Sequence, residues 1–514
     1  MSHCTLPFKL YTQKWQDDVF AKTFRCGERM YNTIIRYALK QIKALEADTR
    51  YQKLRNEYVK LLKKKKLTRH DENRKMLISA YLNQIVLSYG LSEYGFHAYV
   101  VKMKNKSYKG IFDINTAQKI ATQAWKSVSD YLYGDGKKIH FKKIGELESI
   151  EGKNNKSGIK FDKTTNCLNF NGMCIPIKIR KKDEYAIEML KKRICYCRIK
   201  RKPFKNGYKY FLELVLDGDT VKIPELGKGE TGIDQGTSTI AAVGDNDMLL
   251  SAHGITKDKS FEDYNKEIVK YARKTENSLR INNPQNYNSD GTIKKGVKLY
   301  WKRTKNYYKW LFRLKDAYRR KTAFVQQMHN RTANQILKLG DEFITEPMDW
   351  KVLQKRSTKG TEKSDKEITI TNKQGETKTI QKCKKKKRYG KSLNNHSPAY
   401  LEKAIIYKLS LHNKKIKYVN IHTYKASQYN PGTDEYEKCG LSDRVKTVNG
   451  ILIQRDLLSA YLLQKAKRGL KGIDTKSAKA DLNKFIKMHE AYIPTLENTA
   501  NMPKCMGLRE LKKK

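Results

Sequence analysis

Hydrophobic positions change their spacing along the chain, and each change predicts a different kind of element. Between about residues 15 and 135, apolar residues recur at steps of three and four, which is typical of amphipathic helices. From about 136 to 226 the pattern is that of strands. Within this part, RICYCRIKRKPFKNGYKYFLELVLDG predicts a β-hairpin joined through Pro203 and Asn206-Gly207. One short strand, LPFKLY, is expected ahead of the helices.

Three further strands open the second half of the chain. TGIDQGTSTIAAVG and DMLLSAHG predict an antiparallel set with turns at Gln235-Gly236 and Asp245-Asn246. A long helix is expected at about 300–339, where apolar residues form one stripe and basic residues crowd the other faces. The stripe consists of Leu311, Leu314, Tyr318, Val325 and Met328.

Strands and helices alternate from there to the end. EFITEP, at 342–347, and KIKYVNI predict short strands. Ser397 as N-cap and Pro398 at the first helical position predict the start of a helix. IQRDLLSAYLLQKAKRG predicts a helix that stops before Gly469. A last amphipathic helix is expected near 475–491.

The strongly basic charge balance of the chain indicates a polyanionic binding partner. The 514 residues include 107 Lys and Arg against 53 Asp and Glu, which leaves a formal net charge of +54. An excess of this size repels itself in a compact fold, so a polyanion is expected to neutralise much of it. Nucleic acid is the first candidate. The length predicts about two to four domains.

Other features limit the compartment. A membrane surface is the competing polyanion, but no apolar run reaches the ~18–20 residues of a spanning helix. The start, MSHCTLPFKLYTQKW, has no apolar signal-peptide core, so a cytoplasmic protein without membrane contact is expected. The nine cysteines are scattered and show no disulfide framework. Cys195 and Cys197 share a strand face, where we expect reduced, half-buried packing.

Two groups of basic residues are candidates for nucleic-acid contacts. Basic and aromatic side chains occur together on the predicted hairpin, a combination that suits an RNA or DNA backbone. The polar faces of the long helix carry the second group. A solvated surface is the alternative for both. The candidates are Arg198, Lys200 and Arg201 in the hairpin and Arg313, Arg319 and Arg320 in the helix.

Three acidic residues occupy marked positions in the second half. Asp234 lies on the first strand of the antiparallel set, Glu346 ends the strand after the long helix, and Asp456 lies near the start of a late helix. In an RNase H-type fold, that first strand pairs with the fourth strand and a terminal helix packs across the same edge, so the three acids can converge. Taken singly, each has an ordinary alternative as a turn, strand-end or helix first-turn residue.

Phosphodiester hydrolysis is the chemistry that uses such a cluster. It requires an activated water and relief of charge on the leaving oxygen, and two Mg²⁺ ions about 4 Å apart supply both. Mg²⁺ prefers carboxylate oxygens and water, and Mn²⁺ accepts the same ligands. Without metal the acids should repel one another, which raises their pKa values.

Five ordered blocks of the sequence carry a resemblance to a known family. The blocks are GIDQGTSTIAAVG, FITEPMDWKVLQKRS, GKSLNNHSPAYL, KASQYN and LSDRVKTVNGILIQRDLLSAYLL. In these blocks the chain resembles the TnpB proteins of insertion sequences, once called OrfB transposases, which are relatives of the type V CRISPR effector nucleases. The resemblance is strongest across 229–468 and continues more weakly in the N-terminal half, through NTAQKIATQAWKSVSDYL and NFNGMCIPIKI.

The resemblance implies an RNA-guided DNA endonuclease whose partners are a guide RNA and target double-stranded DNA. Asp234, Glu346 and Asp456 would be the catalytic residues and Mg²⁺ ligands of a RuvC-like, RNase H-type domain. Arg444 of LSDR matches a family position near the site and would contact phosphate; a surface arginine is the alternative. A guided protein reads mainly backbone and shape, which fits the abundance of Lys and Arg.

The implied architecture is multidomain α+β. A β-barrel-like wedge domain, 1–14 and 136–228, would carry an inserted helical recognition domain, 15–135. The nuclease domain would follow, interrupted by a basic lid or insert and by a degenerate zinc-ribbon-like segment. In chain order these are nuclease 229–350, insert 351–392, nuclease 393–426, ribbon-like segment 427–453, and nuclease with a helical tail 454–514.

The insert and the ribbon-like segment carry separate expectations. The insert contains a polar hairpin, EITITNKQGETKTI, and a basic run, KKKKRYGK, and we expect a lid that becomes ordered on duplex binding; a solubilising loop is the alternative. Many family members have a CxxC…CxxC zinc ribbon before the last catalytic Asp. Here Cys439 is the only cysteine of that interval, so no structural zinc is expected.

Two other functions stay open on the sequence alone. One is a catalytically silent, guide-RNA-bound repressor that binds DNA without cutting it. The other is a DNA transposase, which shares the acids and the fold but binds terminal repeats without RNA. The intact set of Asp234, Glu346 and Asp456 favours cleavage. Transposon-borne and CRISPR-associated origins, and monomer and dimer, are all compatible with the sequence.

Overall fold

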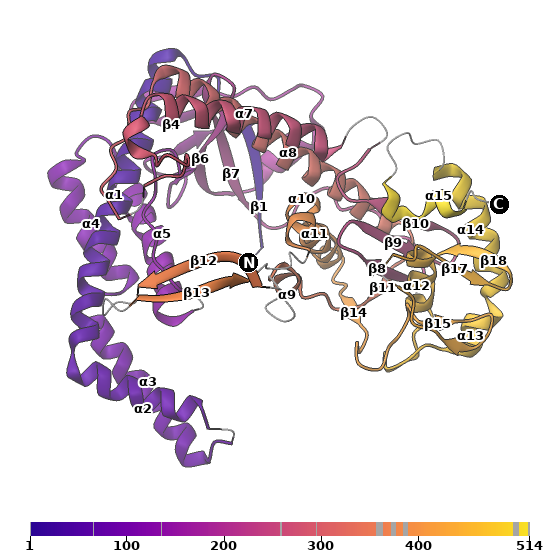
Figure 1. The fold of residues 1–514 in the computed structure, drawn as a ribbon. Helices are drawn as coiled ribbons and strands as arrows, with labels where there is room; N and C mark the ends of the chain where they lie inside the picture. The colour runs from indigo at the N-terminus through magenta and orange to yellow at the C-terminus, as the bar shows by residue number, and fades with distance from the viewer. Residues whose placement is uncertain are drawn as a thin grey trace. The chain divides into compact units, whose positions relative to one another are not determined.

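The chain divides into two compact units, Met1–Lys222 and Ile223–Lys514. Figure 1 shows the fold as given by a computed structural model. No helix among the described residues is long and apolar enough to cross a membrane. The structure describes residues 2–64, 66–134, 136–256, 260–294, 296–355, 363–371, 377–383, 389–440, 442–496 and 503–511.

The first unit is built on a four-stranded antiparallel sheet in the order β1-β7-β6-β2. Its strands are β1 (His3–Lys9), β2 (Ser149–Glu151), β6 (Ile194–Phe204) and β7 (Gly207–Asp217). The predicted hairpin is confirmed, since β6 and β7 pair up to a two-residue turn between Phe204 and Gly207. Gly207 adopts a φ of 139°, a conformation that a residue with a side chain rarely adopts.

The described strands of this unit do not close into a barrel. A separate sheet, β3 (Lys160–Asp162), β4 (Cys167–Phe170) and β5 (Met173–Pro176), meets the first through a bridge between Leu10 and Ile177. A closed barrel needs continuous hydrogen bonding from strand to strand. The three-residue strands β2 and β3 are not paired with each other, so two joined sheets stand where a β-barrel-like wedge was expected.

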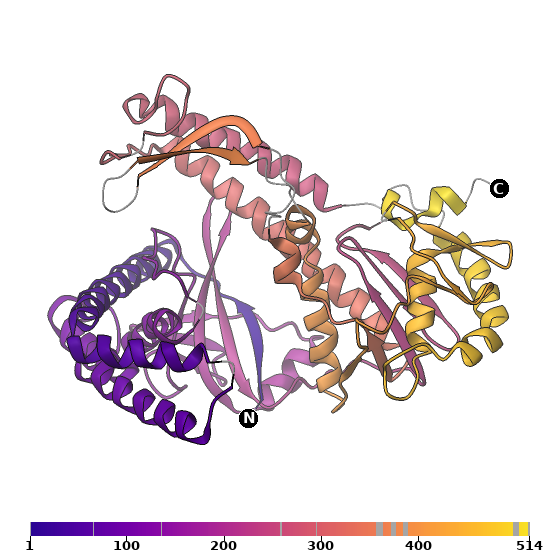
Figure 2. The same ribbon diagram turned by 60° about the horizontal axis from the view of Figure 1, so that its bottom comes forward.

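Five helices lie between β1 and β2 in the chain, which confirms the predicted helical region. Phe20 and Phe24 of α1 are fully buried, and their ring centroids lie 4.6 and 6.0 Å from that of Tyr210 on β7. Figure 2 shows these helices, indigo to violet, on one side of the sheet. The helices are α1 (Lys14–Ala47), α2 (Thr49–Leu62), α3 (Arg69–Ser88), α4 (Glu93–Ser107) and α5 (Ile114–Tyr133); α6 (Glu184–Lys191) precedes β6.

The second unit is a mixed α/β structure around a five-stranded sheet in the order β10-β9-β8-β11-β14. The predicted antiparallel set is confirmed as β8 (Glu230–Gln235), β9 (Thr239–Val243) and β10 (Met248–Ala252). β11 (Glu342–Thr345) pairs in parallel with β8, and β14 (Ile416–Tyr418) pairs in parallel with β11. The pairing of the first with the fourth strand, expected from the order of elements, is therefore present.

Helices cover both faces of this sheet, because successive strand residues point to opposite sides. Ile233, Ala242 and Phe343 pack with α8 (Lys305–Leu337) and α11 (Pro398–Ser410). On the other face, Ala241 and Ile344 pack with α12 (Arg455–Gln464) and α14 (Leu482–Leu496). Helices are therefore present at the places where the sequence predicted them, although some of their bounds differ.

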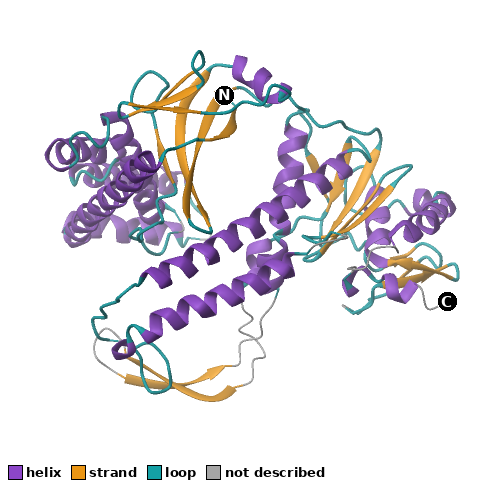
Figure 3. Ribbon diagram, turned by 90° about the horizontal axis from the view of Figure 1, so that it is seen from above, coloured by secondary structure: helices purple, strands orange, loops and turns teal. Residues whose placement is uncertain are grey.

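A helix that the sequence pattern did not predict accompanies α8. α7 (Phe261–Ile281) lies side by side with α8 over much of its length, as Figure 3 shows. The apolar stripe predicted for α8 is wrong at Tyr318, which is 52% exposed. Val325 of the stripe is buried as predicted, and Asp316 and Ala317, which lie outside the stripe, are buried as well, because α8 packs against α7 as well as the sheet.

Helix ends differ from the prediction at two places. Ser397 precedes Pro398 as expected, but it has a φ of 51° and its side chain makes no cap hydrogen bond. α12 ends at Gln464, before Gly469, because the chain turns back through a bridge between Ala466 and Ile473. The predicted last helix is broken at Asp481 into α13 (Thr475–Ala480) and α14.

The insert forms the predicted hairpin, with β12 (Lys363–Thr371) antiparallel to β13 (Thr377–Cys383). The basic run at 384–388 lies outside the described residues. The lid role and the finer domain boundaries stay predictions. The remaining elements are α9 (Trp350–Gln354), α10 (Gly390–His396), β15 (Tyr429–Asn430), β16 (Glu435–Tyr436), β17 (Val445–Val448), β18 (Ile451–Gln454) and α15 (Leu508–Leu511).

Candidate active site

Two of the predicted acids lie at matched positions on neighbouring strands. β8 and β11 pair in parallel through Ile233 and Thr345. Asp234 and Glu346 are the next residue on each strand, so they lie side by side where the pairing ends. In-register neighbours of a sheet point to the same face. Both side chains are partly buried.

The third acid reaches that face because α12 packs directly on β8. Gly232 has no side chain, and a Cβ there would lie 2.0 Å from the Ala460 carbonyl oxygen. Gly232 and Asp234 are two residues apart and share a face, so α12 covers the face that carries Asp234. Asp456, in the first turn of α12, is 8% exposed and accepts a hydrogen bond of 3.2 Å from Thr239 Oγ1 on β9.

The acids are short of positive charge. Burial raises the pKa of Asp234 well above its usual value, repulsion by Asp456 and Glu346 raises this pKa further, and Arg455 partly opposes the shift. Burial also raises the pKa of Glu346. Among the described residues, no Lys or Arg forms an ion pair with Asp234 or Glu346. A cation would therefore relieve this site.

Arg455 is a site residue that the sequence analysis missed. Its Nη2 lies 3.7 Å from Asp456 Oδ1, and its Nη1 donates a hydrogen bond of 2.9 Å to the Gly440 carbonyl oxygen. The guanidinium is thus held beside the acids from the chain position next to Asp456. The only available signal was its place directly before the acid in QRDLLSA.

Arg444, expected to contact phosphate, lies near the same acids. Its carbonyl oxygen accepts a hydrogen bond of 2.9 Å from the Arg455 amide. The charges of Arg444 and Asp456 both act on the Cys505 thiol: burial raises its pKa, Arg444 lowers the pKa, and Asp456 raises it. Arg444 and Asp456 are therefore close to the same side chain. The contact of Arg444 with phosphate stays a prediction.

A basic groove of about 1160 Å³ lies next to the acids and was not predicted. Ser238 and Cys505 line the groove. Thr239, next to Ser238, donates a hydrogen bond to Asp456, and the Asp456 charge raises the pKa of the Cys505 thiol. The helix face at the side of the groove comes from α7, where cations recur at helical spacing, while Glu262 is its one acidic lining residue. The cations of the groove are Lys266, Lys270, Arg273, Lys274 and Lys391.

The basic candidate residues of the hairpin form ion pairs with acidic residues of the same unit. Arg198 lies 3.0 Å from Glu151 and 3.2 Å from Glu213, and Lys200 lies 3.4 Å from Glu213. Arg201 is 6% exposed, paired with Glu28, and its guanidinium carbon lies 4.5 Å from the Phe24 ring centroid. The charge of Arg201 is therefore buried and paired inside the unit, and its role as a nucleic-acid contact stays a prediction.

The basic candidates of α8 are similarly engaged. Arg319 Nη2 lies 2.6 Å from buried Asp316, and Arg320 Nε lies 3.1 Å from the same carboxylate. Arg320 also pairs with Glu267 of α7. The guanidinium carbon of Arg313 lies 4.9 Å from the Trp310 ring centroid. These pairs fasten α8 locally, and the exposed basic face beside the site belongs to α7.

The donor set of the acids fits Mg²⁺, because it consists of carboxylate oxygens. The three acids are not drawn together around a single point. Among the described residues, the one group of three or more possible ligands whose atoms lie within 4.8 Å of one another is His3, Cys195 and Asp217. Two ions about 4 Å apart do not require all three carboxylates to lie in contact, because each ion is bound by only some of the carboxylates.

No protein-family model and no curated protein matches the chain. One similar solved structure is a cryo-EM structure of a Cas12f1-sgRNA-target DNA complex, at 12% identity and a TM-score of 0.39, covering 91% of this chain and 99% of that one. A second is a cryo-EM structure of a CRISPR-Cas12f ternary complex, at 12% identity and a TM-score of 0.26, covering 89% of this chain and 83% of that one. Scores this low assign no family to the chain.

Proposed function

We propose that the protein is an RNA-guided DNA endonuclease whose active site is Asp234, Glu346 and Asp456. The observation that carries the proposal is the gathering of these three carboxylates on one face of β8, β11 and α12, without a matching number of cations. A protein with a net charge of +54 that leaves Asp234 and Glu346 without an ion-pair partner among its described residues is suited to hold divalent metal against a polyanion.

In this proposal Asp234, Glu346 and Asp456 hold Mg²⁺, or Mn²⁺ in its place. When bound, the metal supplies water activation and relief of charge on the leaving oxygen. Thr239 orients the Asp456 carboxylate through its 3.2 Å hydrogen bond. Arg455 and Arg444 bring positive charge to the side of the acids where a phosphate would lie. The strand order supports the expected RuvC-like, RNase H-type domain.

The groove beside the acids is the proposed path of the DNA strand that is cut. Its cations, on the exposed face of α7 and on α10, suit a phosphate backbone, and they line the same groove as Ser238 and Cys505. A guide RNA is the partner that the five resembling sequence blocks imply, and it would choose the target by base pairing.

The test combines bound RNA with cleavage. The protein is purified from a host that carries its native flanking DNA, bound RNA is sequenced, and a plasmid library is incubated with the complex with and without Mg²⁺. We expect a defined copurifying RNA and Mg²⁺-dependent cuts. Asp234→Ala should lower cleavage by about 1,000-fold or more, because the metal's charge stabilisation is worth several kcal/mol.

The matched control is Glu490→Ala, which removes an exposed acid of the same unit. It should cut like the parent, and both variants should bind guide and target as the parent does. Cleavage that survives Asp234→Ala would refute the assignment of the acids.

One observation favours a second candidate, the guide-bound protein that binds DNA without cutting. The three acids do not form a group with all ligand atoms within 4.8 Å. If the RNA-loaded parent binds a matched target but leaves it intact with both Mg²⁺ and Mn²⁺, this second function holds. Sequence-specific binding to terminal repeats by RNA-free protein would instead indicate a transposase.

A further inference from the structure

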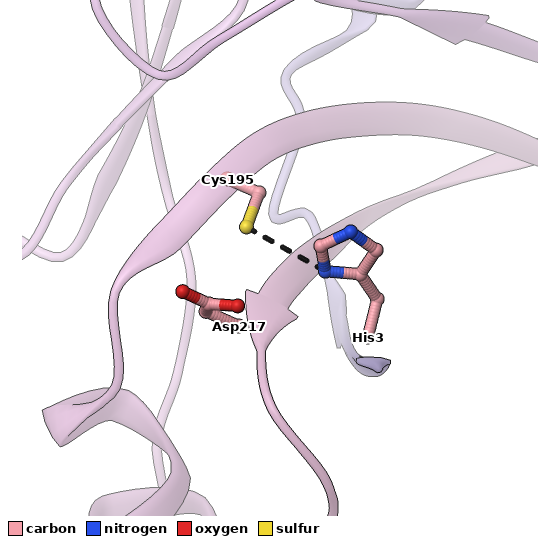
Figure 4. A group of neighbouring side chains, drawn as sticks. All are labelled: His3, Cys195 and Asp217. Carbon is pink, nitrogen blue, oxygen red and sulfur yellow. Dashed lines mark hydrogen bonds between the residues drawn. The ribbon is translucent and has the colours of Figure 1, made fainter. Parts of the chain in front are cut away.

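A mixed group of His, Cys and Asp lies at one edge of the sheet of the first unit. His3 is on β1, Asp217 on β7 and Cys195 on β6, three adjacent strands in the order β1-β7-β6. His3 and Asp217 are direct partners in the β1–β7 register. The three side chains face one another in Figure 4, and their ligand atoms all lie within 4.8 Å of one another.

A break in the strand register directs Cys195 to this place. Ile194 pairs with Leu216 and Tyr196 with Val215, so Cys195 is the extra residue of a β-bulge. Bulges turn a side chain out of the ordinary alternation. Cys197, two residues on, is fully buried, whereas Cys195 is partly exposed beside His3. The expected reduced, half-buried state is present at Cys195, whereas Cys197 is more deeply buried than expected.

The spacing of the group fits a tetrahedral metal ion. Zn²⁺ bonds of about 2.3 Å to sulfur and about 2.0 Å to nitrogen, at a tetrahedral angle, put the two ligand atoms about 3.6 Å apart. Cys195 Sγ lies 3.7 Å from His3 Nδ1. A thiolate, an imidazole and a carboxylate together favour zinc over Mg²⁺ or Ca²⁺, which prefer oxygen ligands alone.

Neighbouring charges leave the group open to a cation. Among the described residues, Asp217 forms no ion pair within 4.0 Å. Lys192, the nearby cation that acts on Cys4, donates its Nζ hydrogen bond of 2.7 Å to the Asp219 carbonyl oxygen instead. His3 is exposed and Cys195 and Asp217 are partly exposed, which gives an entry path and room for a water molecule.

We propose that His3, Cys195 and Asp217 bind one Zn²⁺ ion, with water as the fourth ligand. The ion joins the start of β1 to the start of β6 and the end of β7, segments separated by about two hundred residues of chain. This site does not depend on the nuclease assignment. It departs from the expectation of no structural zinc, which rested on the ribbon-like segment of the other unit.

The test uses the full chain without a polyhistidine tag, with Asp234→Ala as background and excess Mg²⁺ present, so that the acid site does not compete. Metal is removed with a chelator, and ZnCl₂ or CoCl₂ is titrated in under a phosphine reductant. We expect one zinc per chain by mass spectrometry of the metal content. Co²⁺ should give one thiolate-to-metal charge-transfer band and tetrahedral d–d absorption.

Cys195→Ser should abolish the charge-transfer band. His3→Ala should weaken metal binding by about 100-fold or more, since even outer-shell partners are worth 10–100-fold. Cys174→Ser is the matched control: it removes an exposed thiol of the same unit and should leave stoichiometry and spectrum unchanged. A band that survives Cys195→Ser, or a parent chain that takes up no Co²⁺ or Zn²⁺ at micromolar concentration, would overturn the proposal.

Discussion

Two groups of buried acids in this protein have opposite electrostatic surroundings. In the first unit, Glu28 lies on α1 and Glu213 on β7, and arginines of β6 pair with both. Glu28 also accepts a hydrogen bond of 2.8 Å from the Gly145 amide. In the second unit, Asp234 and Glu346 lie beside each other and, among the described residues, form no ion pair with Lys or Arg.

Under the proposed function, this difference separates acids that stabilise the fold from acids that bind metal. Burying a charge costs free energy unless the charge is paired, and in the first unit the arginines offset the cost of burying the acids. The acids of the second unit remain mutually repelling, and this repulsion raises the pKa of Asp234. Arg455 opposes this shift only in part, so a bound cation would relieve the remaining repulsion.

Breaking the paired group should have the largest effect on stability. Arg201→Ala leaves Glu28 charged and buried in the first unit, which should cost about 3–5 kcal/mol. Hydrogen–deuterium exchange of the full chain would show this as faster exchange in peptides of α1 and β6.

Lys200→Ala is the control on the same strand. Lys200 is paired more loosely, at 3.4 Å from Glu213, so its loss should cost less than about 1 kcal/mol. Equal exchange in the Arg201 and Lys200 variants would mean that the buried pair contributes no more than a surface one.

Displacing the unpaired group should have an intermediate effect on stability and a larger one on activity. A Cβ at position 232 would lie 2.0 Å from the Ala460 carbonyl oxygen, so Gly232→Ala must move α12. Overpacking of this kind costs about 1–3 kcal/mol. Because Asp456 moves with α12, cleavage should fall by about 100-fold, the penalty of a misplacement of about 1 Å.

Gly469→Ala is the matched glycine control, since a Cβ there meets nothing within 4 Å. Thermal melting and plasmid cleavage of the two variants would check the prediction. A Gly232→Ala variant with the parent's melting temperature and activity would show that α12 does not set the position of Asp456.

Removing one repelling charge should have the smallest effect, and it has a definite sign. The folded-state pKa of Asp234 is raised above its usual 3.8, so the unfolded chain loses this proton first as pH rises. The metal-free protein therefore loses stability as pH rises from about 4 through the folded-state pKa. Asp234→Asn should raise the metal-free melting temperature at neutral pH by about 2–4 °C, the shift that about 1 kcal/mol gives in a domain of about this size.

The measurement is thermal melting with a chelator near pH 4 and near pH 7.5. The gain of Asp234→Asn should vanish at the lower pH, and Mg²⁺ should stabilise the parent at neutral pH but not the variant. A gain that is equal at both pH values would show that repulsion among the acids is not its cause.

The sequence by itself predicted most of the strands and helices, though not α7, and named the three acids as candidates. Alternating residues predicted the β6–β7 hairpin and the strands β8, β9 and β10, because strand periodicity depends on near neighbours in the chain. The order of strands and helices also indicated that Asp234, Glu346 and Asp456 could converge.

Tertiary structure decided which charged side chains form ion pairs within the protein and which remain exposed for a partner. Arg198, Arg201 and Arg320 are predicted candidates for nucleic-acid contacts, yet each is paired by an acid from a distant part of the chain, while Arg319 pairs with Asp316 of its own helix. The basic groove on α7, the place of Arg455, and the bulge that turns Cys195 toward His3 likewise depend on packing and strand register. Local pattern specifies the elements because it depends on adjacent residues, whereas the state of a charge depends on partners that are distant in the chain.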